Sequence, residues 1–168
     1  METFAAVRTM LAVREYEDRP VPEEIVARIL EAARLTGSAR NRQPWEFIVV
    51  QDKDMLSRLG ELSSTGSYIA NAPLAIVVLV PDSPIGATDG ARAVQDMMLV
   101  AWEEGIGSNW VSHMDTPEVR TLLNIPDGSK ILTVIPFGYP AKAIGAGVKS
   151  RKKLEEIAHR ERYGAPFE

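Results

Sequence analysis

Apolar residues in this chain follow helical spacing in some segments and form continuous runs in others, and the two patterns alternate. The helical pattern is clearest over residues 22–35, where Ile25, Ile29 and Ala33 recur on one face. The clearest strand is Leu74 to Val80, which is apolar on both faces and is therefore expected to be buried on both sides. Interleaved helices and strands predict an α/β or α+β class around one sheet.

Capping and breaking residues locate the ends of these elements. Asp52 and Thr116 are predicted N-caps, Gly37 follows the end of a helix, and residues 81–86 are expected to form a loop because prolines and a glycine cluster there. The predicted helices cover residues 2–12, 22–35, 53–62, 88–104 and 151–162, with another opening at Thr116-Pro117-Glu118, and the predicted strands cover 47–50, 74–80, 108–112 and 131–135.

The amino-acid composition limits the kinds of functional site that the chain can contain. The 168 residues fit one domain, and the complete lack of cysteine excludes disulfides, thiolate nucleophiles and iron–sulfur clusters. The two histidines, His113 and His159, are interpreted as a loop residue and a solvent-facing residue, and no metal site is expected. A net charge of −4 gives no drive toward nucleic acid or membrane, and the sequence shows no signal peptide or spanning segment, so a cytoplasmic protein is expected.

A basic segment near the C-terminus stands out against this acidic average. From Lys149 to Arg162 there are six lysines and arginines against three glutamates, after a glycine-rich approach at 145–147. A phosphate monoester is typically bound by backbone N–H groups, by a helix N-terminus and by cationic side chains such as the forked guanidinium of arginine. The alternative is that these residues bind no ligand and are the solvent-exposed, basic start of a helix.

A second unusual segment is the polar stretch Gly37 to Trp45, between an amphipathic helix and a buried strand. A long polar loop at the mouth of a sheet is a candidate ligand surface, and its amide side chains can pair with the edge of a heterocycle. A purely structural turn is the alternative. The glycines at 105 and 107 begin like a dinucleotide fingerprint, but they follow a helix and the motif ends in Trp110, so that interpretation fails.

Taken together, the motifs of this chain resemble those of the nitroreductase family of flavoproteins. Each motif alone is weak, but their order and spacing over nearly the whole chain are specific. The matching segments are Val13-Arg14-Glu15-Tyr16, Arg19-Pro20-Val21-Pro22, residues 29–34, Ser38 to Phe47, Tyr68 to Pro73, Asp89 to Met98, Gly105 to Trp110, Phe137-Gly138-Tyr139-Pro140 and Lys149-Ser150-Arg151.

The resemblance implies an α+β sandwich with a central mixed, mainly antiparallel sheet flanked by helices, in a homodimer with two FMN sites at its interface. It implies that Lys149 and Arg151 hold the FMN phosphate. Ser38, Asn41 and Gln43 are then expected beside the isoalloxazine and ribityl chain, and Asn71 at the ring edge. Arg14 matches a basic residue near the flavin N1/O2 edge, where a fixed cation favours reduction.

The sequence departs from the family in its first motif. The pattern Arg-Arg-Ser-x-Arg is replaced by Met10-Leu11-Ala12-Val13-Arg14, so a phosphate-binding arginine and a hydroxyl are missing. Losing one charge-assisted hydrogen bond costs roughly 1.5–3 kcal/mol, about 10- to 150-fold in affinity. Arg8, Arg40 and Arg42 are candidate substitutes.

The resemblance predicts a flavin-dependent oxidoreductase that takes electrons from NAD(P)H and passes them to a quinone, nitroaromatic or similar acceptor by a ping-pong cycle. In this hypothesis flavin N5 carries the chemistry and no side chain acts as catalyst, in keeping with the lack of Cys and the few His. The alternatives are a non-catalytic flavin or small-ligand binding protein, and a deazaflavin-dependent reductase on the same fold.

Overall fold

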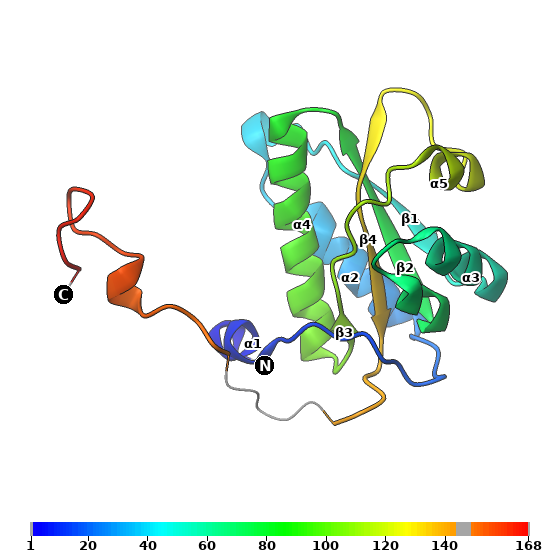
Figure 1. Cartoon of the computed structure of the whole chain (residues 1–168), viewed down its shortest axis with the longest axis horizontal. Helices are drawn as coiled ribbons and strands as arrows, with labels where there is room; N and C mark the ends of the chain where they lie inside the picture. Colours follow the sequence, from blue (N-terminus) through cyan, green and yellow to red (C-terminus); the bar gives the residue numbers. More distant parts are fainter. Residues whose placement is uncertain (1, 144–148, 168) are drawn as a thin grey trace.

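The computed structural model describes residues 2–143 and 149–167, and the glycine-rich stretch 145–147 lies outside them. Four strands form one sheet in the order β1-β2-β4-β3, with every neighbouring pair antiparallel (Figure 1). The strands are β1 (Glu46–Val50), β2 (Leu74–Pro81), β3 (Gly107–Ser108) and β4 (Ser129–Gly138). The helices are α1 (Thr3–Thr9), α2 (Glu23–Leu35), α3 (Lys53–Leu62), α4 (Pro84–Glu103) and α5 (Pro117–Leu122), with 3-10 turns η1 (Ala39–Asn41), η2 (Ser67–Asn71) and η3 (Leu154–Glu156).

Helices cover both faces of the sheet: α2 and α4 one face, α3 and α5 the other (Figure 1). Strand β2 supplies both cores because successive side chains point to opposite faces. Leu74, Ile76 and Val78 pack with α2 and α4, whereas Ala75 and Val77 belong to the cluster on the other face. The prediction that β2 is buried on both sides is confirmed.

Side-chain caps fix several helix starts. The carboxylate of Asp52 accepts a hydrogen bond from Met55 N and the hydroxyl of Thr116 accepts one from Val119 N, so both predicted N-caps are confirmed. The loop predicted over 81–86 was wrong in its second half. The Ser83 hydroxyl accepts a hydrogen bond from Gly86 N and so caps the helix. Pro84 lies in the first turn, where the backbone N–H that proline lacks would have no partner within the helix, so α4 begins at Pro84.

The segment after α1 runs extended beside β3. Val13 N donates to Ser108 O at 3.0 Å, and Ala12 forms an isolated parallel bridge with Ser108. The four-stranded sheet itself is antiparallel throughout, so the parallel component of the expected mixed sheet is limited to this one bridge outside the strands. The strand predicted over 108–112 is shorter than predicted: β3 ends at Ser108, and only Val111 pairs again, with Val134.

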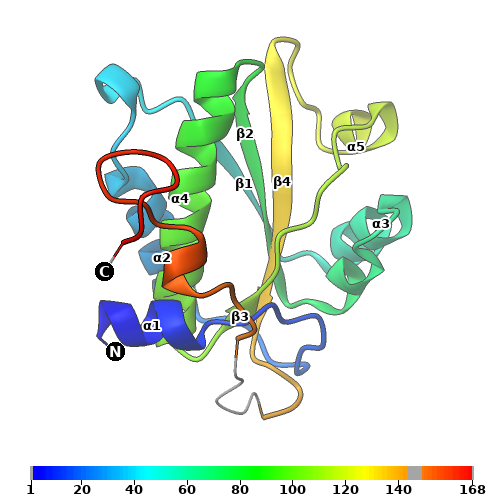
Figure 2. The same cartoon turned by 60° about the vertical axis from the view of Figure 1, so that its left-hand side comes forward.

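The helix predicted over 151–162 was wrong. This segment contains only the short turn η3 and then folds back on itself, with His159 paired to Pro166. Short isolated helices are marginal in water unless an apolar face packs on something. The segment instead forms an arm that leaves the body of the chain near α1 (Figures 1 and 2). We call residues 150–167 the C-terminal arm.

Candidate functional site

The polar loop before β1 has an unusual backbone. Arg40, Asn41 and Gln43 have φ values of 54°, 54° and 49°, in the left-handed region that non-glycine residues rarely occupy. Ser38 Oγ accepts a hydrogen bond from Gln43 N at 2.8 Å, which closes the loop. Three of the sequence-predicted residues are therefore held together, and we call Ser38, Asn41 and Gln43 the loop group.

One buried carboxylate anchors the loop to α4. Asp89 Oδ2 accepts a hydrogen bond from Ala39 N at 2.9 Å, although Asp89 itself is only 3% exposed. Trp45 at the other end of the loop is buried in the core between the sheet and α2 and α4. The resemblance did not point to Asp89 as a site residue. The only sequence signal was a carboxylate among the small residues of the first turns of α4.

Arg14 and Asn71 line one groove of about 800 Å³, beside Tyr16. The Arg14 guanidinium carbon lies 5.9 Å from the centre of the Tyr68 ring, at the outer limit of a cation–π contact. The Tyr68 hydroxyl in turn accepts a hydrogen bond from the side-chain amide of the buried Asn109. Tyr68 and Asn109 were not predicted as site residues, because the contact of Tyr68 with Arg14 and the hydrogen bond of Asn109 to Tyr68 both depend on tertiary structure.

The two C-terminal cations lie where the arm begins, beside α1. Lys149 Nζ donates to Val7 O at 2.7 Å, and an Arg151 guanidinium nitrogen donates to Ser150 O at 2.7 Å. Within the described residues neither cation forms an ion pair with a carboxylate. Both are thus available to an anion. We call Arg14, Lys149 and Arg151, with Asn71 beside Arg14, the cation group.

Helix α4 separates the two groups within one chain. Near the start of α4, Asp89 holds the loop group through its hydrogen bond with Ala39 N. Near the end of α4, Trp102 Nε1 donates to Thr9 Oγ1 of α1 at 3.0 Å. Trp102 follows Asp89 by thirteen positions on the helix, which is about 20 Å at the rise of an α-helix. Figure 1 shows η1 beside one end of α4 and α1 beside the other. One chain therefore does not bring the seven predicted residues together.

Tyr16 fixes the segment that carries Arg14. Its hydroxyl donates to Val13 O at 2.7 Å in a buried environment. Burial raises the pKa of Tyr16 well above its ordinary range; the nearby Tyr68 raises it further, and Arg14 opposes the shift. Tyr16 therefore stays neutral and acts as a hydrogen-bond donor to the backbone.

The atypical motif at 10–13 is used for packing. Met10 ends α1, and Val13 is buried against Gly107 of β3. Of the three candidate substitutes for the missing arginine, Arg40 and Arg42 lie on the loop at the far end of α4. Arg8 lies in the last turn of α1, next to the residue whose carbonyl binds Lys149. Arg8 is therefore the candidate on the same end of α4 as the cation group.

Comparison with known proteins assigns the chain to a family. The model of the nitroreductase family matches residues 8–82 and 67–139. The two matches together run over most of the 168 residues. The chain belongs to the nitroreductase family. The resemblance seen in the sequence is confirmed, and so is the expected α+β fold.

Members of the nitroreductase family with similar sequences and structures cover nearly the whole chain. A provisionally named NADH dehydrogenase/NAD(P)H nitroreductase of Methanothermobacter thermautotrophicus is 34% identical over 154 residues, covering 86% of this chain and 81% of the relative. A crystal structure of a similarly named protein from Parabacteroides distasonis has 30% identity and a TM-score of 0.86, covering 96% and 98% of the two chains. An FMN-dependent nitroreductase from Clostridium difficile has 26% identity and a TM-score of 0.85, covering 95% and 99%.

The described residues contain neither a metal-binding cluster nor a membrane-spanning helix. Within residues 2–143 and 149–167, no three His, Asp or Glu side chains gather where they could hold a metal ion. No helix in the same residues is long and apolar enough to cross a membrane.

Proposed function

We propose that this member of the nitroreductase family is a flavin-dependent oxidoreductase that passes reducing equivalents from NAD(P)H through FMN to a small acceptor such as a quinone or nitroaromatic. Family membership carries the proposal. The names of two relatives, an NADH dehydrogenase/NAD(P)H nitroreductase and an FMN-dependent nitroreductase, support the donor and the cofactor. In a ping-pong cycle donor and acceptor use one space in turn, and the groove beside Arg14 and Asn71 is a candidate for that space.

The residues present fit FMN. Lys149 and Arg151 have no carboxylate partner among the described residues, so both can neutralise its phosphate, and Arg8 supplies a third positive charge near Lys149. Arg14 provides a cation at the groove, where it favours negative charge on a bound ring. FMN supplies the two-electron redox chemistry when bound. The chain contributes binding, orientation and electrostatics.

We propose further that the protein is a homodimer in which the loop group of one chain completes the site formed by the cation group of the other. The separation of the two groups along α4 supports this arrangement, because a single chain leaves each half of the site incomplete.

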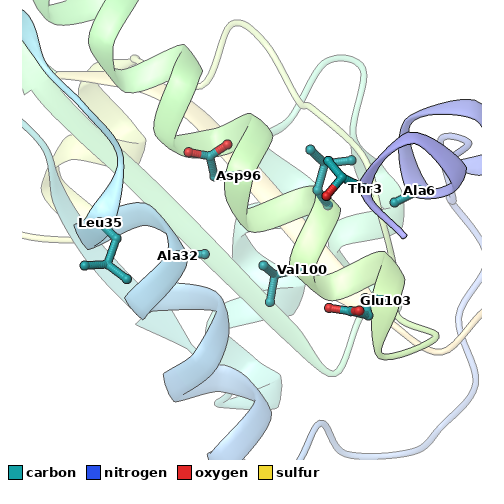
Figure 3. A pocket seen from close by; sticks show the side chains of 8 residues that line it. Thr3, Ala6, Ala32, Leu35, Asp96, Val100 and Glu103 are labelled. Atoms are coloured by element: carbon teal, nitrogen blue, oxygen red, sulfur yellow. The ribbon is translucent and has the colours of Figure 1, made fainter. Parts of the chain in front are cut away.

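Exposed apolar surface also supports a dimer. The C-terminal arm exposes Leu154 and Ile157 to 60% and 61%, and α1 exposes Phe4 to 72%. A groove between α1, α2 and α4 is lined by Ala6, Ala32 and other largely apolar residues, with Asp96 and Glu103 at its margin (Figure 3). Exposed apolar surface of this kind marks an interaction site, and a second copy has a basic, apolar arm to cover it.

The visible absorption spectrum of the purified protein tests the reaction. We expect a yellow protein whose flavin bands are bleached by NADH or NADPH and restored by a quinone. A protein that binds FMN but is bleached by neither donor is the non-catalytic alternative, and uptake of a deazaflavin in place of FMN supports the second alternative. A colourless protein that takes up no added FMN would exclude the proposal.

Mixed dimers test the shared site. One variant carries Ser38→Ala, Asn41→Ala and Gln43→Ala, and the other carries Lys149→Ala and Arg151→Ala, so each homodimer should lose FMN. In a mixed dimer one site combines an intact loop with intact cations, and we expect co-expression to recover FMN binding. If both groups serve one chain's own site, co-expression recovers nothing.

A further inference from the structure

Asp89 is a buried carboxylate that the proposed chemistry does not use. It is 3% exposed, and its Oδ2 accepts the hydrogen bond from Ala39 N at 2.9 Å. Burying a carboxylate is costly unless it is paired and hydrogen-bonded. Its second oxygen lies 3.7 Å from Arg92, whose side chain is largely exposed. The carboxylate is thus directed at the backbone of the loop.

Arg92 meets the same stretch of backbone. A Cβ added to Gly37 would lie 3.2 Å from an Arg92 guanidinium nitrogen, so this side chain is packed against the loop two residues before Ala39. Asp89 and Arg92 are one helical turn apart on α4. Together they contact the point where the chain leaves α2 and enters the loop.

The loop needs such an anchor because its conformation is strained. Three residues within four positions have positive φ, and none of them is a glycine: Arg40, Asn41 and Gln43. Residues persist in such conformations only when surrounding contacts hold them there. The hydrogen bond from Gln43 N to Ser38 Oγ closes the loop, but this bond is internal and does not attach the loop to the rest of the chain.

We propose that Asp89 is a positioning residue of the flavin site: through Ala39 N it holds the loop in the left-handed conformation that presents Ser38, Asn41 and Gln43. The inference rests on the proposed function, because the loop group is taken to contact the flavin. In the proposed dimer, Asp89 of one chain serves the site whose cations come from the other chain.

The same helix offers a matched control. Asp96 lies two turns after Asp89 and accepts a hydrogen bond from Thr36 Oγ1 at 2.5 Å. Thr36 is the residue that ends α2, before the loop begins. Replacing Asp96 therefore removes a comparable bond between α4 and the same region and leaves the bond to Ala39 in place.

Two measurements test the proposal: amide hydrogen exchange at Ala39 in the flavin-free protein, and the Kd for FMN. In Asp89→Ala we expect Ala39 exchange to accelerate at least tenfold and the FMN Kd to rise about tenfold, as expected for the loss of a hydrogen bond to a charged group. Asp89→Asn keeps an oxygen acceptor and should restore both values to within about threefold of wild type. Asp96→Ala should lower the melting temperature and leave Ala39 exchange unchanged. If Asp89→Ala does not fold, Asp89→Ser replaces it, because its shorter side chain does not reach Ala39.

The outcomes separate this inference from the function on which it rests. Unchanged Ala39 exchange in Asp89→Ala or Asp89→Ser overturns the anchoring role, whatever happens to FMN. Faster exchange with an unchanged FMN Kd, while Arg151→Ala loses FMN, overturns the positioning role and leaves the proposed function intact. A wild-type protein that binds no FMN overturns the proposed function, although the exchange result at Ala39 still stands.

Discussion

Tyr16 shows how one side chain links packing to the candidate site. Its ring is buried with Val13 and Ala72, and its hydroxyl satisfies the carbonyl of Val13, the residue before Arg14. A buried carbonyl left without a donor costs about 1–3 kcal/mol. The tyrosine hydroxyl therefore stabilises the chain just where Arg14 enters the groove.

The raised pKa of Tyr16 predicts a loss of stability in alkali. In the unfolded chain Tyr16 ionises near its ordinary value of about 10, whereas the folded protein keeps it protonated. The stabilisation is complete below about pH 10 and is lost as the pH rises above it, by up to about 1.4 kcal/mol per pH unit. Urea unfolding at pH 8 and pH 11 should show this loss in wild type and a smaller loss in Tyr16→Phe. Equal losses in the two proteins would contradict the prediction.

At the scale of elements, the contact between residues 10–13 and β3 depends on a single glycine. A Cβ on Gly107 would lie 2.2 Å from Val13 Cγ2, closer than any real contact of this kind. The two segments approach closely enough for the Val13–Ser108 backbone bond only because Gly107 has no side chain.

Gly107→Ala should therefore destabilise the protein by about 1–3 kcal/mol, the usual cost of overpacking. Because the displaced segment leads into Arg14, the FMN Kd should rise as well. The double variant Gly107→Ala with Val13→Gly removes every Val13 side-chain atom from the clash and should recover part of the FMN affinity. Chemical denaturation and FMN titration measure the two effects, and a double variant that binds FMN no better than Gly107→Ala alone would refute the link.

The elements that the sequence predicted well are those with a local cause. Strand β2 has a continuous apolar run, and Asp52 and Thr116 cap the helices that follow them. The expected helix at 151–162 did not form because nearly all of its residues are exposed, so no apolar face packs on the described part of the chain. The same holds for the candidate site. The resemblance indicated which residues belong to it. The role of Asp89 and the separation of the two groups by about 20 Å along α4 depend on tertiary structure and could not be predicted.

For the whole molecule, the proposed dimer depends on apolar residues that a lone chain exposes. Ile157→Glu in the arm and Leu35→Glu beside the groove place a charge where a second copy would cover it, at 61% and 67% exposure. Since burying an unpaired charge is strongly unfavourable, we expect the dimer Kd to rise at least tenfold in each variant, with parallel loss of FMN. Val49→Glu on β1, at 37% exposure, is the control and should change neither. Sedimentation equilibrium measures the change; three identical dimer constants would remove the arm and the groove from the interface.

The C-terminal arm also has a consequence for the lifetime of the protein. A newly made chain that has not met a second copy presents Ile157 and the 95%-exposed Tyr163 on a segment that projects from the body (Figure 1). Exposed terminal segments are where proteases cleave first, whereas association protects what it covers. We expect surplus single chains to be degraded and paired chains to persist. The arm would then set the lowest concentration at which the protein accumulates in a cell.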